Sequence, residues 1–159
     1  MTQRLNYFET SPELSRKYLD FSTALKKSPV TRELGHLVDL RASQINGCGF
    51  CVDMHVKQAK IEGERELRLH HVAVWRESTL FSPRERAALA WTETVTTLPA
   101  HGVSDEAYQA VREHFSEAEV TDLTLLIVRI NGWNRLGVTF RTVPGSADAA
   151  YGLDKAGLQ

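Results

Sequence analysis

The chain has 159 residues, of which 42% are apolar and 25% are charged, and its formal net charge is −1. This length and composition are ordinary for one globular domain. Acidic and basic residues are interspersed, which excludes a general electrostatic field that would attract nucleic acid or an anionic membrane. There is no long apolar run that could span a membrane and no apolar signal-peptide segment, so we expect a cytoplasmic protein.

Helical signals follow one another along most of the chain. Serine–proline pairs at residues 11–12 and 82–83 are typical of a helix cap followed by proline in the first turn. Ser82 and Ser116 each have glutamate three residues later, which is the pattern of a capping box, and Thr31 is the expected cap of the second helix. The expected helices cover about residues 12–27, 32–45, 48–62, 64–75, 83–98, 105–115 and 117–143.

The fold class follows from the spacing of the apolar residues. They recur every three or four positions, whereas the strict alternation of β-strands is absent, so we predict an all-α bundle of about six to eight helices. Residues 146–159 follow a Pro-Gly-Ser sequence and carry few large apolar side chains. We therefore expect one domain over residues 1–145 and a flexible C-terminal tail over residues 146–159.

The two cysteines are the strongest chemical signal. Cys48 and Cys51 form a C-x-x-C pair directly after the helix-breaking Asn46-Gly47, and His55 lies one helical turn beyond Cys51. A thiol at a helix N-terminus faces unpaired backbone N–H groups, which favour its thiolate form. Two cysteines so close in sequence cannot close a long loop, so we expect a redox-active or metal-binding role.

The C-x-x-C pair alone leaves several interpretations open, of which a redox dithiol is favoured. A zinc site could use Cys48, Cys51, His55 and His36 if the helices before and after the break pack together. Haem attachment is excluded because Val52, and not histidine, follows the second cysteine. Two buried thiols beside a core histidine are the purely structural alternative.

Four segments together resemble the AhpD-like branch of the carboxymuconolactone decarboxylase superfamily. They are SQINGCGFCVDMH, AVWRES, FSPRERAALAWTE and INGWNR, in this order. The resemblance implies an AhpD-like helical bundle that assembles into dimers, trimers or hexamers. It also implies an antioxidant thiol peroxidase that reduces alkyl hydroperoxides through a dithiol/disulfide cycle.

The resemblance implies a role for each residue of the pair. Cys51 would become sulfenic acid, and Cys48 would protonate the leaving group and then close the disulfide, with His55 in the proton relay. The substrate would be a small hydroperoxide, and the reductant a dithiol protein or a lipoyl group. No metal and no cofactor other than the dithiol itself is implied, and neither a nucleic acid nor a membrane is an expected partner.

Two positions depart from the family pattern. A glutamate usually stands twelve residues before the first cysteine, where this chain has His36, and some members carry histidine where this chain has Phe50. A neutral histidine can accept a proton as glutamate can, so we include His36 among the predicted catalytic residues, in an altered relay. General disulfide reductase activity and a non-catalytic zinc-stabilised oligomer remain alternatives. Lactone decarboxylation is disfavoured because that chemistry requires no cysteine pair.

Polar residues on two other helices are expected to support this region. Asn131 and Asn134 lie in an otherwise apolar helix, where we predict packing or interface hydrogen bonds. Arg41 and Ser43 precede the cysteines by less than two turns, so they are candidates for orienting the pair.

Overall fold

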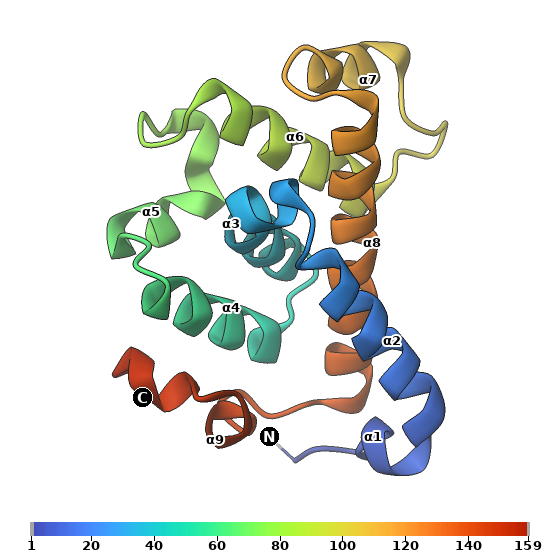
Figure 1. The fold of residues 1–159 in the computed structure, drawn as a ribbon, viewed down its shortest axis with the longest axis vertical. Helices are drawn as coiled ribbons and strands as arrows, with labels where there is room; N and C mark the ends of the chain where they lie inside the picture. The colour runs from blue at the N-terminus through green and yellow to red at the C-terminus, as the bar shows by residue number, and fades with distance from the viewer. Residues whose placement is uncertain (1, 159) are drawn as a thin grey trace.

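The computed structural model describes residues 2–158, which form nine α-helices and two 3-10 helices and contain no strand (Figure 1). The all-α prediction is confirmed, and short helices near both ends raise the number above six to eight. No described helix is long and apolar enough to cross a membrane. The elements are α1 (Tyr7–Thr10), α2 (Pro12–Leu25), α3 (Pro29–Ile45), α4 (Gly49–Ile61), α5 (Glu66–His71), η1 (Val72–Glu77), α6 (Pro83–Thr97), α7 (Asp105–Arg112), α8 (Glu117–Phe140), α9 (Asp148–Tyr151) and η2 (Leu153–Ala156).

Most helix starts follow the sequence signals. Ser82 and Ser116 form complete capping boxes at α6 and α8, each with the glutamate three residues later. The prediction that Thr31 caps the second long helix is wrong, because α3 begins two residues earlier at Pro29. Proline has a backbone dihedral suited to a helix and lacks only an N–H that the first turn leaves unpaired, so Ser28-Pro29 both ends α2 and starts α3.

Helix α3 is the centre of the fold and packs against α4, α6 and α8 (Figure 1). Its buried residues Val30, Leu34 and Val38 join one apolar cluster with α6, α7 and α8. Leu37 and Leu40 join a second cluster with α4, α5, η1 and α6. Burying each such side chain contributes about 1.5–3 kcal/mol. Because α3 contributes side chains to both clusters, it joins the two halves of the core.

The longest helix, α8, has 24 residues and lines one side of the bundle (Figure 1). Helix α2 packs closely against it at Gly132, where an added Cβ would lie 1.9 Å from the Tyr18 hydroxyl oxygen. The absent side chain lets the Tyr18 hydroxyl donate to the backbone carbonyl of Arg129 at 2.7 Å. This contact holds α2 against α8.

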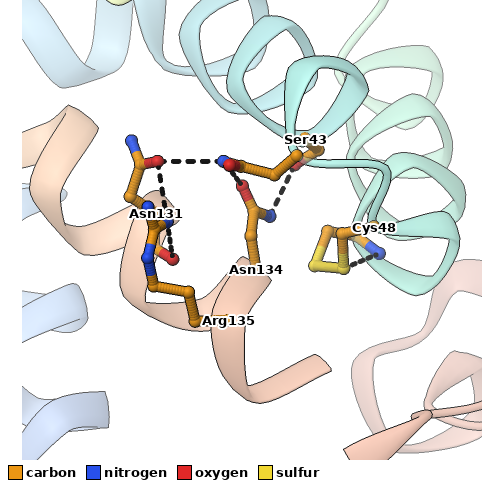
Figure 2. The surroundings of a disulfide bond; sticks show 7 residues. Ser43, Cys48, Asn131, Asn134 and Arg135 are labelled. Atoms are coloured by element: carbon orange, nitrogen blue, oxygen red, sulfur yellow. Dashed lines mark hydrogen bonds between the residues drawn. A yellow bond between two sulfur atoms is a disulfide. The ribbon is translucent and has the colours of Figure 1, made fainter. Parts of the chain in front are cut away.

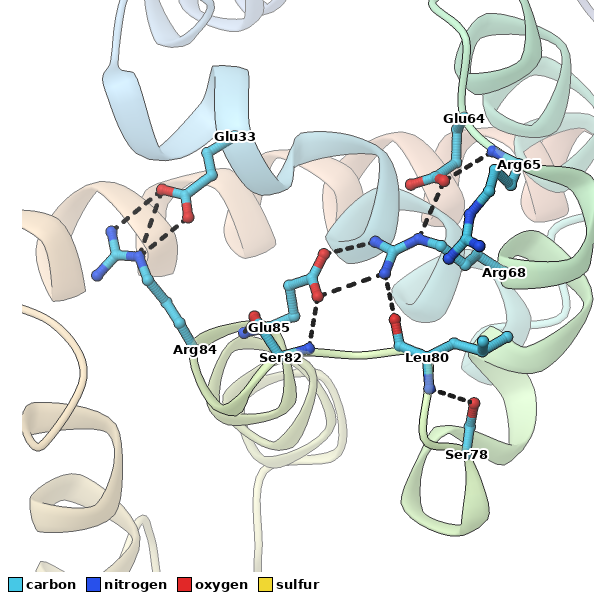
Figure 3. Close-up of polar contacts among 9 residues, drawn as sticks. All are labelled: Glu33, Glu64, Arg65, Arg68, Ser78, Leu80, Ser82, Arg84 and Glu85. Atoms are coloured by element: carbon cyan, nitrogen blue, oxygen red, sulfur yellow. Dashed lines mark hydrogen bonds and ion pairs between the residues drawn. The ribbon is translucent and has the colours of Figure 1, made fainter.

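Two arginines join α6 to its neighbours α5 and α3 (Figure 3). Arg68 of α5 pairs with Glu64 and with Glu85, the glutamate of the α6 capping box. Arg84 of α6 pairs with Glu33 of α3 at 3.1 Å. The side chains that begin α6 therefore also fix its position against α3 and α5.

The C-terminal segment differs from the expected flexible tail. Within its described part, residues 146–158, the segment forms α9 and η2 and packs against α4, with Leu153 and Ala156 buried. Lys57 of α4 lies under this segment and contacts Asp148 at 2.6 Å and Asp53 at 3.0 Å. The Asp148 hydrogen bond is the main reason that the pKa of Lys57 is raised, and the ammonium therefore stays charged. The composition of the segment indicates none of these long-range contacts.

We predict that Lys57→Met loosens the C-terminal segment and lowers the free energy of unfolding by about 2 kcal/mol, because Asp53 and Asp148 lose their shared cation. Denaturant unfolding measures the stability, and hydrogen exchange of residues 145–156 measures the loosening. Lys60→Met is the matched control on the same helix, since Lys60 pairs with exposed Glu66. Equal effects of the two substitutions would contradict the prediction.

Candidate active site

The start of α4 is built around a disulfide between Cys48 and Cys51. Gly47, at φ +64°, lets the chain turn sharply after α3, and the Cys48 N–H then donates to the Ser43 carbonyl at 3.0 Å. Cys48 is the N-cap residue of α4, and its Sγ accepts the Cys51 N–H at 3.3 Å. The predicted placement of the cysteines at a helix N-terminus is confirmed. Both are buried, with 2% and 3% of their surfaces exposed.

An amide network holds this turn against α8 (Figure 2). Asn46 donates to the side-chain oxygens of Asn131 and Asn134 at 2.9 Å each. Asn134 is fully buried and donates to the Ser43 hydroxyl at 3.0 Å. The predicted packing role of the two α8 asparagines is therefore confirmed, and Ser43 supports the pair through both its side chain and its backbone.

Arg41 has a different role from the one that its sequence position suggests. Its Nε donates to Glu93 of α6 at 2.7 Å, and Glu93 also accepts the indole N–H of Trp75 at 2.8 Å. These bonds tie α3 to α6 and η1, so Arg41 stabilises the fold on the side of α3 that faces α6.

His55 follows Cys51 by one turn of α4 and is 6% exposed. Its Nδ1 lies 3.0 Å from Gln58 Oε1 and 3.6 Å from Asp39 Oδ2. The Arg129 Nη2 in turn contacts both Asp39 carboxylate oxygens, at 2.6 and 2.7 Å. Figure 1 shows how three helices, α3, α4 and α8, converge to bring these groups together.

Burial lowers the pKa of His55 below its ordinary value because the charged imidazolium loses its hydration. Asp39 and the Gln58 hydrogen bond act in the opposite direction, whereas the positive charge of Arg129 lowers the pKa further. The ring is therefore neutral at pH 7 and free to accept a proton, as a general base must be.

Three neighbours of His55 were not predicted from the sequence: Asp39, Gln58 and Arg129. Asp39 lies three residues after His36 and so on nearly the same face of α3, which was an available signal, because a carboxylate is the group expected at position 36. Nothing in the sequence indicated that Arg129 lies near His55, because its contact with Asp39 joins residues 90 positions apart.

His36 lies at the edge of the site. Its side chain is 29% exposed, and its Nε2 is 2.8 Å from the carboxylate of Glu62, which is 67% exposed. Within residues 2–158, no group of three or more histidine, cysteine, aspartate or glutamate side chains is arranged to hold a metal ion, so the four ligands of the alternative zinc interpretation are not assembled. The catalytic role of His36 stays a prediction.

The backbone of α8 lies directly against the sulfur atoms. A Cβ added at Gly137 would lie 2.9 Å from Cys48 Sγ and 3.5 Å from Cys51 Sγ. Any side chain at this position would therefore occupy the space of the disulfide. A Cβ added at Gly49 would be in ordinary contact with Pro144, at 3.7 Å, in the loop that follows α8. The dithiol is thus enclosed by α8 on one side, and the start of α4 is bordered by the loop that contains Pro144.

Known proteins are similar to this chain in sequence. A family model described as "Carboxymuconolactone decarboxylase family" matches residues 12–94. The uncharacterized protein YdfG of Bacillus subtilis is 41% identical over 138 residues, which are 87% of this chain and 94% of YdfG. The chain belongs to the carboxymuconolactone decarboxylase family.

Solved structures of similar proteins identify the branch of the carboxymuconolactone decarboxylase family. Atu0492 of Agrobacterium tumefaciens, a protein of unknown function proposed to be the antioxidant defence protein AhpD, has a TM-score of 0.86 and 40% identity. The match covers 90% of this chain and 98% of Atu0492. The chain is accordingly an AhpD-like member. The debrominase Bmp8, solved with 2,3,4-tribromopyrrole, shares the fold at 19% identity and a TM-score of 0.76, covering 94% of this chain and 79% of Bmp8.

We predict that Gly137→Ala destabilises the oxidised protein by about 1 kcal/mol or more, because the new methyl group meets a sulfur atom that the disulfide holds in place. This net loss remains after the gain of about 1 kcal/mol that alanine brings to a helix interior, because over-packing costs up to about 3 kcal/mol. Gly35→Ala is the control, since its Cβ would meet only Thr31 at an ordinary 3.6 Å and should stabilise α3. The two variants are compared by urea unfolding without reductant, and equal stability would contradict the prediction.

Proposed function

We propose that this AhpD-like protein is an antioxidant thiol peroxidase that reduces alkyl hydroperoxides through the Cys48–Cys51 pair. The observation that carries the proposal is a pair of sulfurs near enough to bond at the N-terminus of α4, with the buried neutral His55 one turn away. Family membership and the likeness to Atu0492 support it. An external dithiol, from a protein or a lipoyl group, restores the reduced pair.

The proposed cycle begins when His55 takes the proton of the Cys51 thiol. The Cys51 thiolate attacks the terminal hydroperoxide oxygen, the O–O bond breaks, and Cys51 becomes sulfenic acid. The leaving alkoxide takes the Cys48 proton and departs as an alcohol. The Cys48 thiolate then attacks the Cys51 sulfur and expels hydroxide, which takes the proton from His55 and leaves as water. One hydroperoxide and two thiols thus give one alcohol, one water and one disulfide.

The geometry supports this division of labour between the two cysteines. The Cys48 sulfur caps α4 and accepts the Cys51 N–H, so a negative charge on Cys48 is stabilised once its proton has gone to the alkoxide. Cys51 lies within the first turn on the same face as His55, which suits it to transfer its own proton to the imidazole. His36 acts in this proposal from the edge of the site, where its Coulombic effect lowers the pKa of His55.

A second candidate function is general disulfide reduction. It is favoured by the same capping position of Cys48, because a thiolate stabilised at a helix N-terminus can attack an external disulfide. This function would use both cysteines but would not require His55 to deliver a proton to an alkoxide.

We predict that Cys51→Ser abolishes dithiol-dependent consumption of cumene hydroperoxide, because serine cannot form the sulfenic acid. Cys48→Ser should still react once and then stop, and the trapped sulfenic acid should be labelled by dimedone at Cys51. Alcohol release and mass spectrometry of labelled peptides provide the measurements. Unchanged turnover by Cys51→Ser would contradict the proposal, whereas reduction of a disulfide substrate without any hydroperoxide consumption would favour the second candidate.

A further inference from the structure

Asp39 differs in kind from the other group that faces His55 Nδ1. The Gln58 amide can present either its oxygen or its NH₂ group by rotating, so it accommodates both neutral forms of the ring. An ionised Asp39 can only accept, and Arg129 holds it 3.6 Å from Nδ1 with two short contacts to its oxygens. Gln58 Oε1 is nearer to Nδ1, at 3.0 Å, but the fixed negative charge of the carboxylate favours a proton on the nitrogen that faces it.

We propose that Asp39, held by Arg129, is the positioning residue that keeps the proton of neutral His55 on Nδ1 and so leaves Nε2 as the proton-exchanging nitrogen. This inference rests on the proposed function, because it assigns His55 the proton of the Cys51 thiol. It gives His55 a carboxylate partner, Asp39, in a chain that has a histidine and not a carboxylate at position 36.

The remaining surroundings of His55 support the assignment. The charged or titratable groups that act on the ring are Asp39 and His36 from α3 and Arg129 from α8. Helix η2 also packs on α4, but its charged Asp154 and Lys155 are exposed. Asp39 thus supplies the acidic group at the ring, and it is itself only 7% exposed.

A purely structural ion pair would behave differently from a positioning pair. If Asp39 and Arg129 served only to join α3 to α8, removal of either charge would weaken the fold in the same way. In the positioning role, the two charges act on His55 in opposite directions, since Asp39 raises the pKa of the ring and Arg129 lowers it. Opposite shifts of the His55 pKa show that both charges act on the ring, and the tautomer of the ring separates a positioning pair from a purely structural one.

The test follows the His55 ring nitrogens by ¹⁵N NMR in the intact protein as the pH is varied. We expect the wild-type protein to show the Nδ1–H form. Asp39→Asn should lose that preference and lower the pKa of His55 by about one unit, whereas Arg129→Met should raise it by about one unit. Asp20→Asn makes the same chemical change on the exposed face of α2 and should alter neither quantity. Shifts of the same sign in the two pair variants, or an unchanged tautomer in Asp39→Asn, would overturn the inference.

A double variant keeps the test decisive if one unpaired charge prevents folding. Asp39→Asn with Arg129→Met removes both charges together and leaves no buried charge without a partner. Loss of the Nδ1–H preference in this protein supports the role of Asp39, and its retention shows that Gln58 selects the tautomer and overturns the inference.

The functional consequence is read in hydroperoxide turnover. Asp39→Asn should lower kcat at pH 7 about tenfold or more with little change in KM, and Asp39→Glu should recover part of the loss. Wild-type kcat in Asp39→Asn would overturn the inference even if the peroxidase proposal holds. If the wild-type protein consumes no hydroperoxide, the peroxidase proposal fails, and the NMR result still decides whether Asp39 positions His55.

Discussion

The contact between the α3–α4 turn and α8 is the constraint on which the rest of the site depends. Gly47 allows the sharp turn, Cys48 caps the new helix, and Asn134 of α8 binds Ser43 from inside the core. Because Gly137 has no side chain, the α8 backbone can lie directly against the sulfurs. The same approach brings Arg129 to Asp39, so one helix–helix contact determines both the enclosure of the dithiol and the charges around His55.

Local chemistry made much of this architecture predictable from the sequence. The capping boxes at Ser82 and Ser116, the break at Asn46-Gly47 and the cysteines at a helix start all depend on residues within one or two turns of each other. The all-α fold followed from apolar spacing, which a strand would not produce. The position of α3 at the centre was not predictable in the same way, since its burial depends on how the other helices fold around it.

The parts that the sequence did not reveal all involve long-range contacts. Asp39 and Arg129 look like ordinary helix charges until α3 and α8 pack, and Lys57 gains its partner Asp148 only when the C-terminal segment docks on α4. The expectation for His36 came from its place in the family pattern, whereas the structure pairs it with Glu62 at the edge of the site. The histidine at position 36 therefore did not by itself indicate that the carboxylate near His55 belongs to Asp39.

The proposed peroxidase cycle requires that hydroperoxide oxidise the enclosed dithiol within one chain. It is tested most directly by adding one equivalent of cumene hydroperoxide to the fully reduced protein under anaerobic conditions and analysing the product by mass spectrometry. We expect one alcohol for each chain and loss of both thiols into a Cys48–Cys51 disulfide. Intact thiols with unconsumed hydroperoxide would contradict it.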